Sequence, residues 1–589
     1  MKIKIIYTWL YFLIIGLFPN NSKCQTTWPP GGQERSPFKI TLPEGRFLPS
    51  SKRWNLIWAD QLVPSWIREK HLEFAAKRFI GTQKIWKSQI EQFRKFNPNF
   101  LNLIYHLAAG LNPERNSDCP DPKTSGGSDF IGVVSPAGYV SEWKEHFLPW
   151  LSKMNITLES PRFENMFQHY DTIDKNHRVW HQDPYWLMNI INPDWTDYIA
   201  QQASDWIIGN SGDGCFFDVS VEFATSLYNP KLSNPSPKNF NWWQIPHGPD
   251  DAVGKIDRIN EFAKWINPKY LKYYKFIYNK LHNKGNDFLI IPNTDQMVTT
   301  NYDPVWLDGD STGETIDGAM MEGWGNYYKY DMWLTIDRAV RHITGRGKIL
   351  IAQFGANTSA ERMRRTGMYM LVKNENSYIC INPGSVDWYP EYEIDLGEQS
   401  RLPASLDSLR VNGTLWSSLF KRDYDNGCVL CNTSDSDIVF KPEETGDWYK
   451  VETTGGGVLS DSGYMKAQSI KYIPLNNNTI AVPWNNCIIL KKNISSIKSA
   501  EFNMNKIDFE IFPTIVDDNA SIRLRSGEFL TYEISIFDCL GVQRMFLSKG
   551  ELSSEETLLN IDAEGLTCGV YFVRLSAGGT VMTKKIIVK

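Results

Sequence analysis

The sequence has no excess of positive charge and no long apolar run beyond its first residues. Its 62 Lys and Arg are outnumbered by 67 Asp and Glu, and the formal net charge is -5. Such a balance gives no reason to expect nucleic acid or an anionic membrane surface as a partner. Beyond Phe18 no stretch is apolar for long enough to cross a bilayer, so we predict no transmembrane segment.

Several signatures of cofactor and nucleophile chemistry are also absent. The one Gly-x-Ser-x-Gly run, residues 309–313, comes before an expected strand instead of between a strand and a helix, which argues against the nucleophile elbow of an esterase. Its 9 histidines do not combine with Asp, Glu or Cys at a metal-binding spacing, so we expect no metal and no other cofactor. The 9 cysteines do not have the spacing of a disulfide framework, and Cys428 and Cys431 are interpreted as two positions on one strand.

The N-terminus has the pattern of a secretory signal peptide. Lys2 and Lys4 precede an apolar run over residues 5–18, and a polar stretch follows up to Cys24. A charged start, a short apolar centre and a cleavage region are typical of a signal peptide, here residues 1–24. We therefore expect an exported protein, secreted or attached to the cell surface.

Residues 50–395 alternate strand-like with helix-like segments. The strand-like segments are apolar without alternation, which is typical of parallel strands buried on both faces. Eight of them are expected, over residues 76–81, 100–107, 165–170, 215–218, 287–292, 316–321, 348–354 and 377–381. Eight strands interleaved with helices predict an α/β fold, a (β/α)8 TIM barrel. The alternative, an open doubly wound sheet, requires a glycine-rich phosphate loop after the first strand, and residues 81–84 (Gly-Thr-Gln-Lys) do not form one.

The pattern changes after the barrel. Residues 398–495 contain short alternating strands separated by Asn, Gly and Asp turns, which predicts a small β-sandwich. A linker of about ten residues follows, and residues 508–589 form a last β module. We therefore expect three domains after the signal peptide.

Two of the expected strands end in a carboxylate, Asp218 and Glu322. In a (β/α)8 barrel the C-terminal ends of the strands face the active site. Hydrolysis of a glycosidic bond needs one acid to protonate the leaving oxygen and a second carboxylate to attack or to activate water. We predict Asp218 as nucleophile or base and Glu322 as general acid, with Asp295 and Glu222 in reserve. The structural alternatives are an Asp that caps the next loop and a surface acid in a turn.

Aromatic residues lie on loops at the same expected end of the barrel. Their rings could stack on the C–H faces of sugars, and each could equally be part of the packing. The residues predicted to bind a poly- or oligosaccharide substrate are Trp324, Tyr327, Trp242, Trp243 and Trp388.

The last module resembles the C-terminal sorting domain of the type IX secretion system. The residues that carry the resemblance are Phe512-Pro513, the run 532–538 with Leu540-Gly541, the run 569–575 and the final six residues. One departure is Thr514, where the family usually has Asn. The resemblance implies that the module is a secretion address, a partner for the secretion machinery in a bacterium with two membranes, with passage through the periplasm.

Residues 70–490 resemble glycoside hydrolase barrels that carry a small C-terminal β domain. The carrying motifs are Asn192-Pro193-Asp194-Trp195, the run 213–218 and the run 423–432 with its Asn-Gly-x-Val-Leu-x-Asn hairpin. Acids on strands four and six are similar to those of the clan of retaining α-galactosidases. The resemblance implies a secreted glycoside hydrolase. The alternative is a non-catalytic carbohydrate-binding or cell-surface protein on a barrel scaffold.

Overall fold

The computed structural model divides the 589-residue chain into two compact units, Met1–Asn493 and Ile494–Lys589. The described residues are 34–35, 42–111, 133–135, 138–140, 142–169, 173, 175, 178, 180–181, 185–218, 227–228, 259–282, 287–294, 303–325, 331–403, 405–414, 417–442, 446–492, 507–512, 514–517, 519–525, 530–539, 541–552, 557–577 and 580–589. The signal peptide predicted for residues 1–24 lies outside them.

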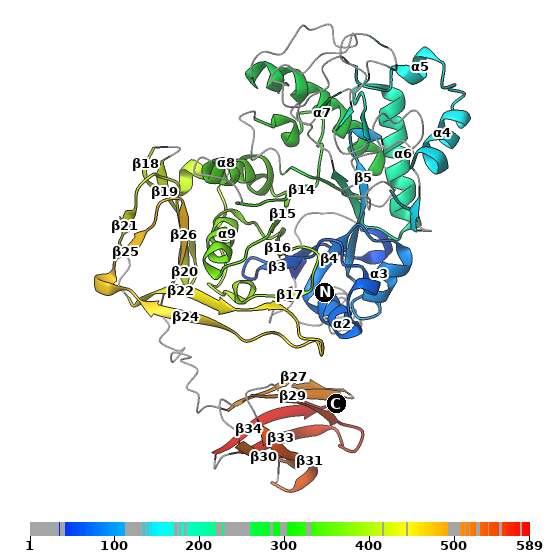
Figure 1. Cartoon of the computed structure of the whole chain (residues 1–589). Helices are drawn as coiled ribbons and strands as arrows, with labels where there is room; N and C mark the ends of the chain where they lie inside the picture. Colours follow the sequence, from blue (N-terminus) through cyan, green and yellow to red (C-terminus); the bar gives the residue numbers. More distant parts are fainter. Residues whose placement is uncertain are drawn as a thin grey trace, which may run out of the picture. The chain divides into compact units, whose positions relative to one another are not determined.

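The centre of the first unit is a closed parallel barrel (Figure 1). Its strands follow one another around the barrel in chain order: β3 (Leu56–Trp58), β4 (Phe79–Gln83), β5 (Leu101–Leu107), β11 (Gly214–Asp218), β13 (Leu289–Pro292), β14 (Gly318–Met321), β15 (Ile349–Phe354) and β16 (Ser377–Ile381). The last strand pairs with the first, and a parallel bridge between Asn293 and Met320 joins β13 to β14. The prediction of a (β/α)8 barrel is therefore confirmed.

Of the first three expected strands, 76–81 overlaps the second barrel strand and 100–107 matches the third, whereas 165–170 was wrong and the first barrel strand was missed. The first barrel strand, β3, has only three residues, which is too short to show a periodic pattern. The segment 165–170, expected as the third strand, is not in the barrel, and its residues Phe167 and His169 make only isolated bridges. The strand expected at 100–107 is the third of the barrel, and the last five strands lie where they were expected.

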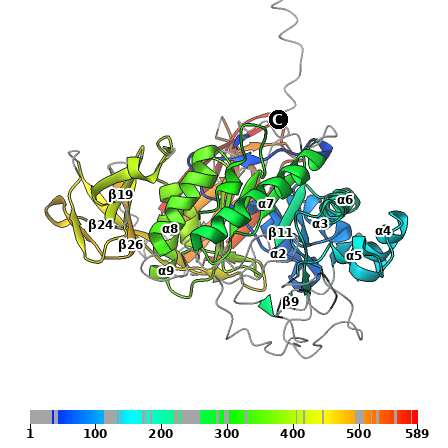
Figure 2. The same ribbon diagram turned by 90° about the horizontal axis from the view of Figure 1, so that it is seen from above.

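Helices surround the barrel strands. They are α2 (Glu69–Arg78), α3 (Lys87–Arg94), α6 (Pro193–Gly209), α7 (Ile259–Leu281), α8 (Asp331–Arg338) and α9 (Ser359–Val372). Helix α6 begins as its sequence predicts, because the Asn192 side chain accepts from two backbone N–H groups and Pro193 occupies the first helical position. In the view from above, α4 (Leu148–Lys153) and α5 (Pro161–Glu164) lie at one side of the barrel and a β-rich part at the other (Figure 2).

Two insertions after β5 and β11 meet in a small antiparallel sheet. Its strands are β12 (Leu227–Tyr228), β9 (Trp180–His181), β10 (Tyr185–Leu187) and β6 (Gly110–Leu111), in that order. Further short pairs are β1 (Glu34–Arg35) with β2 (Pro49–Ser50) and β7 (Val133–Ser135) with β8 (Gly138–Val140). The insertion sheet links segments from two different strand ends of the barrel.

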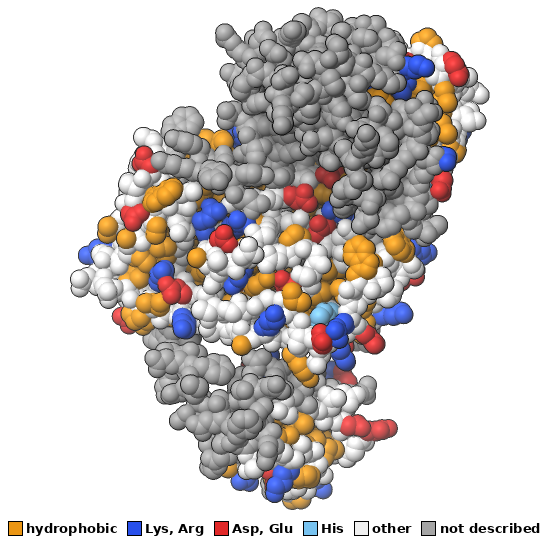
Figure 3. All heavy atoms as spheres, viewed as in Figure 1, with side chains coloured by type: hydrophobic (Ala, Val, Ile, Leu, Met, Phe, Trp, Pro, Cys, Tyr) orange, Lys and Arg blue, Asp and Glu red, His pale blue; other side chains and the backbone are white. Residues whose placement is uncertain are grey.

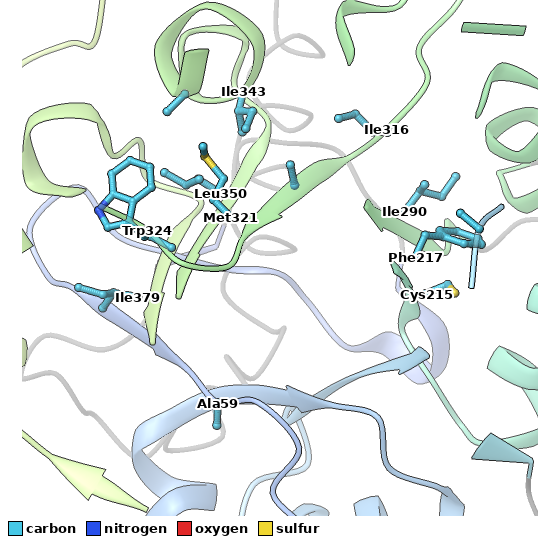
Figure 4. Packing of buried hydrophobic residues seen from close by; sticks show 14 of the residues in the cluster. Ala59, Cys215, Phe217, Ile290, Ile316, Met321, Trp324, Ile343, Leu350 and Ile379 are labelled. Atoms are coloured by element: carbon cyan, nitrogen blue, oxygen red, sulfur yellow. The ribbon is translucent and has the colours of Figure 1, made fainter. Parts of the chain in front are cut away.

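The barrel strands separate two hydrophobic clusters. In β11, Phe216 belongs to the cluster inside the barrel, together with Tyr105 and Met320. Its neighbours Cys215 and Phe217 belong to the cluster between strands and helices, where Figure 4 shows them beside Ile290. Alternate residues of a strand point to opposite sides, so one apolar run supplies both clusters. Each fully buried Phe contributes about 1.5–3 kcal/mol to folding.

The β domain belongs to the same compact unit as the barrel. Its six-stranded sheet has the order β18 (Arg410–Gly413), β19 (Ser418–Tyr424), β20 (Gly427–Asn432), β26 (Asn486–Lys492), β22 (Trp448–Gly455) and β24 (Gln468–Pro474). A second layer pairs β21 (Ile438–Phe440) with β25 (Ile480–Val482), and one apolar cluster joins the two layers. The domain boundaries predicted from the sequence remain predictions.

Strands β20 and β26 carry a cysteine pair at the side that faces α9. Cys428 and Cys431 both lie on β20, as expected, but Cys431 forms a disulfide with Cys487 of β26. A Cβ atom on Gly367 of α9 would lie 2.5 Å from the Cβ of Cys487. The helix therefore approaches the sheet closely at a position where any larger residue would clash.

The second unit consists of two β-sheets around its own apolar core. One sheet has the order β27 (Asp508–Phe512), β29 (Asn519–Arg525), β32 (Thr557–Asp562). The other has the order β28 (Ile515–Val516), β34 (Thr580–Val588), β33 (Gly569–Ala577), β30 (Leu530–Asp538), β31 (Gln543–Leu552). Residues of both sheets, such as Ile522 and Val573, share one cluster. The unit is thus a β-sandwich.

Candidate active site

Three carboxylates lie at the C-terminal ends of the barrel strands. Asp218 is the last residue of β11, Glu322 follows β14 directly, and Asp60 lies two residues beyond β3. All three side chains are half-buried. Figure 3 shows acidic side chains near the centre of one face, over the region of β14, with basic side chains over α9. Asp218 and Glu322 therefore lie at the ends of β11 and β14, and their catalytic roles remain predictions.

One amide joins the two acids that the sequence singles out. Asn293, the residue after β13, donates from Nδ2 to Asp218 Oδ1 at 3.0 Å and to Glu322 Oε2 at 2.9 Å. These two oxygens can lie no further apart than the sum of the two distances, 5.9 Å. Strands four, five and six thus bring Asp218 and Glu322 to one point.

Neighbouring strands supply further donors to both acids. The Tyr105 hydroxyl of β5 donates to Asp218 Oδ2 at 2.9 Å. Gln353 of β15 donates from Nε2 to Glu322 Oε1 at 3.1 Å. Tyr105 and Gln353 are themselves buried, so the donors are held in place by packing. Each acid therefore accepts hydrogen bonds at both of its oxygens.

The electrostatic surroundings favour the protonated form of Glu322. Burial raises the pKa of this carboxyl above the ordinary value of a glutamate. The nearby Lys84 ammonium acts in the opposite direction, whereas the negative charges of Asp218 and Asp60 raise the pKa further. The net result is a raised pKa, and Glu322 has the tendency to retain a proton that a general acid needs.

Asp60 and Lys84 form an ion pair beside these two acids. Lys84 Nζ lies 3.3 Å from each Asp60 carboxylate oxygen, and Gln83 donates to Asp60 Oδ1 at 2.8 Å. Burial by itself lowers the pKa of Lys84, but the charges of Asp60, Glu322 and Asp218 outweigh burial and raise it. The lysine is therefore charged.

Sequence reasoning missed Asp60, Lys84, Asn293 and Gln353. Asp60 follows the one barrel strand that is too short to recognise. Lys84 lies directly after β4, in the run 81–84, which has no recognisable motif. For the two amides the only available signal is their position at the end of a barrel strand, where side chains face the site.

Two predicted substrate-binding residues do not face the site. Trp324 and Trp388 are both 0% exposed. The Trp324 indole donates to the Arg365 carbonyl of α9 at 3.1 Å, and Trp388 packs against Phe74 and Phe79 and donates to Glu393 at 2.6 Å. Rings enclosed in this way cannot stack on a sugar, so these two predictions are wrong.

The other predicted site residues lie outside the described part of the chain. These are the reserve acids Asp295 and Glu222 and the aromatic residues Tyr327, Trp242 and Trp243. Their roles remain predictions. Within the described ranges, no cluster of three or more His, Cys, Asp or Glu has the geometry of a metal site. Among the helices of the same ranges, none is long and apolar enough to cross a membrane.

Two family models match separate parts of the chain. Residues 247–428 match the hypothetical glycosyl hydrolase family 15, and residues 510–589 match the secretion system C-terminal sorting domain. The first match includes Glu322 and Gln353, whereas Asp60, Lys84 and Asp218 lie before it. No curated protein matches the chain. The predicted resemblances to a glycoside hydrolase barrel and to a sorting domain are confirmed.

Solved structures of other proteins also show a low similarity to the chain. A cycloisomaltooligosaccharide glucanotransferase from Paenibacillus sp. is 9% identical, with 76% of this chain and 56% of that chain covered and a TM-score of 0.30. A maltogenic α-amylase from Thermotoga neapolitana is 10% identical, with coverages of 74% and 99% and a TM-score of 0.33. A GH36 α-galactosidase from Geobacillus stearothermophilus is 9% identical, with coverages of 75% and 56% and a TM-score of 0.35. The chain thus spans just over half the length of two of these proteins.

Proposed function

We propose that the chain is a retaining glycoside hydrolase that cleaves an extracellular poly- or oligosaccharide. The observation that carries the proposal is the Asn293 amide, which holds an oxygen of Asp218 and one of Glu322 within 5.9 Å of each other. Retaining enzymes place their two carboxyl groups about 5–5.5 Å apart, and inverting enzymes about 6.5–9.5 Å apart. The shorter separation leaves no room for the water molecule that inverting enzymes hold between the general base and the sugar.

Asp218 is the nucleophile in this proposal. It accepts hydrogen bonds from Tyr105 and Asn293, which fix the orientation of its carboxylate towards the substrate. Glu322 is the acid/base, because burial raises its pKa and keeps a proton available for the leaving oxygen. The two acids thus have the unequal environments that their two roles require.

The reaction has two steps. Glu322 gives its proton to the glycosidic oxygen while the Asp218 carboxylate attacks the anomeric carbon, so that the C–O bond breaks and a glycosyl ester of Asp218 forms. Glu322 then takes a proton from water, and the water oxygen attacks the same carbon and releases Asp218. The hydrolysis needs no cofactor in this scheme.

The stereochemistry of the first product tests the proposal. We expect NMR of a fresh digest to show a sugar with the anomeric configuration of the substrate. Glu322→Ala should lose hydrolysis, and added azide should restore turnover by attacking the glycosyl ester to give a glycosyl azide of retained configuration. Asp205→Asn, at an exposed acid of α6, is the matched control and should behave as the unmodified chain.

Three results would contradict the proposal. An inverted product would exclude the ester on Asp218. Full activity of Asp218→Asn would exclude this residue as nucleophile. Binding to polysaccharides without release of reducing ends would support the alternative, a non-catalytic carbohydrate-binding protein.

The sorting domain indicates how the chain reaches its substrate. Residues 510–589 match this domain, and they lie within a compact unit of their own, Ile494–Lys589. We propose that the chain crosses the periplasm and is then secreted or attached to the cell surface. A chain that ends at residue 493 should keep its hydrolytic activity in a lysate and be absent from the medium and the cell surface. Export of this shortened chain would contradict the proposal.

A further inference from the structure

The ion pair between Asp60 and Lys84 has no role in the two-step reaction, although it lies beside both catalytic acids. Gln353 connects the ion pair to Glu322. Its Nε2 donates to Glu322 Oε1 at 3.1 Å and lies 3.4 Å from Asp60 Oδ2. Gln83 holds the other Asp60 oxygen at 2.8 Å. The pair is therefore a fixed part of the site and not a surface ion pair.

Stability does not explain why charged groups occupy these positions. The Lys84 residue is only 7% exposed, and taking two charges out of water costs free energy that their attraction often does not repay. Lys84 also has a φ of 64°, which is unfavourable for a residue with a side chain. Backbone strain of this kind is concentrated at ligand-binding and catalytic positions.

Among the residues that the structure describes, the charges around Lys84 disfavour an anionic ligand. The carboxylates of Asp60 and Asp218, together with Glu322 when it is ionised, act on its single ammonium group and raise its pKa. An anionic group on the sugar would meet this excess of negative charge, and the ammonium that could attract it is already paired with Asp60. A neutral hydroxyl is different, because it can donate to Asp60 and accept from Lys84 at the same time.

We infer that Asp60 and Lys84 bind hydroxyl groups of the sugar whose glycosidic bond is cleaved, and that this sugar is neutral rather than a uronic acid or a sulfated residue. The inference rests on the proposed function, since it places the sugar between Asp218 and Glu322. A carboxylate and an ammonium 3.3 Å apart can bind two neighbouring hydroxyls, one by each charge. Asp60 and Lys84 are thus specificity-determining residues.

A glycan array probed with the full chain tests the inference. The probe carries Glu322→Gln, which keeps the shape of the site and prevents turnover. We expect it to bind arrayed neutral glycans and not uronic-acid or sulfated ones. Adding Asp60→Asn, or in a separate chain Lys84→Gln, should weaken binding to the best neutral glycan by about 10- to 100-fold, the effect of losing a charged hydrogen bond.

The matched control replaces an exposed ion pair of the same type. Asp197→Asn removes the partner of Lys280 on the outside of the barrel and should leave glycan binding unchanged. Thermal unfolding of each variant identifies any that fails to fold. For such a variant the array is replaced by competition for glycan binding to the Glu322→Gln chain, with a neutral monosaccharide and with the corresponding uronic acid as competitors. Stronger competition by the neutral monosaccharide supports the inference, and stronger competition by the uronic acid contradicts it.

Two results would overturn the inference: strongest binding to uronic-acid or sulfated glycans, or unchanged affinity of both Asp60→Asn and Lys84→Gln. The proposed function fails by a different measurement, the configuration of the hydrolysis product. If the two variants lose binding and the unmodified chain gives an inverted product, Asp60 and Lys84 still bind the sugar, but the retaining mechanism is rejected. Absence of binding to every glycan would contradict both.

Discussion

Strands β11 and β14 each have an acid at both ends, and the two ends differ in their surroundings. Asp213 and Asp317 precede the strands, and both are fully buried. Asp213 accepts from Arg46 and, at 2.9 Å, from Arg94, and Asp317 contacts His282 Nε2 at 3.0 Å. Each also accepts a backbone N–H of the neighbouring strand, both at 2.8 Å. These acids fasten one strand to the next.

The acids at the other ends of the same strands have different partners. Asp218 and Glu322 are half-buried and accept hydrogen bonds from a tyrosine hydroxyl and from amides, which carry no charge. Removing a buried acid that is paired with a charged group costs several kcal/mol of folding free energy, because the partner keeps an uncompensated charge, whereas an acid held by neutral donors leaves no such charge behind. The same residue type therefore has a structural role at one end and, in our proposal, a chemical role at the other.

The largest expected effect is a loss of activity, and it distinguishes the acids at the C-terminal ends of β11 and β14 from those at the N-terminal ends. Glu322→Gln should lower kcat/KM by about 10²- to 10⁴-fold, the usual contribution of a general acid. Its free energy of unfolding should change by no more than about 0.5 kcal/mol, because the amide keeps the shape of the carboxyl. Initial rates and denaturant unfolding of the purified chain measure both. Full activity of Glu322→Gln would show that Glu322 has a structural role, like Asp213 and Asp317.

The next effect concerns the opposite end of β11. Asp213→Asn leaves Arg46 and Arg94 without their buried countercharge and should cost about 3–5 kcal/mol of folding free energy. Activity per folded molecule should be unchanged. Asp197→Asn is the control, since its exposed pair with Lys280 should contribute no more than about 1 kcal/mol. Equal stability of Asp213→Asn and Asp197→Asn in denaturant unfolding would refute the structural role.

A smaller effect tests the glycines that begin both strands. A Cβ on Gly214 would lie 2.3 Å from the Leu289 carbonyl oxygen, and one on Gly318 would lie 2.4 Å from that of Ile349. Gly214→Ala and Gly318→Ala should each destabilise the chain by about 1–3 kcal/mol through overpacking. The control is Gly355→Ala, which should have little effect because no atom lies closer than 3.7 Å to the added Cβ. Gly347 is not an equivalent position, because its φ of 76° would add backbone strain. Unfolding midpoints of the three variants give the comparison.

The sequence predicts the later part of the barrel better than its beginning. Strands such as β11 and β14 are apolar runs bounded by Gly and an acid, so their position can be read directly. The three residues of β3 carry no such pattern, and Asp60 was missed with them. A strand of this length forms because its neighbours β4 and β16 provide partners on both sides.

The site is predictable where it depends on strand ends and unpredictable where it depends on tertiary packing. Asp218 and Glu322 follow from their strands, but nothing local indicates that Asn293 will lie between them. Trp324 has the sequence context of an exposed loop residue, between two glycines. The φ of 70° at Gly323 and 66° at Gly325 belongs to a turn that places the indole against α9 instead.

The smallest expected effect is a shift in the pKa of Glu322 when the Asn293 amide is removed. It tests how a neutral donor acts on an acid at the C-terminal end of a strand. The Asn293 hydrogen bond lowers the pKa of Glu322, in opposition to the increase caused by burial. Asn293→Ala should therefore raise this pKa further. Since Glu322 acts in its protonated form, activity is lost as the pH rises through its pKa, and the alkaline limb of kcat/KM should move to higher pH. A pH–rate profile measures the shift. Removing a neutral donor that favours ionisation can only raise the pKa of Glu322. An alkaline limb that moves to lower pH would therefore show that the amide does not stabilise the charged acid.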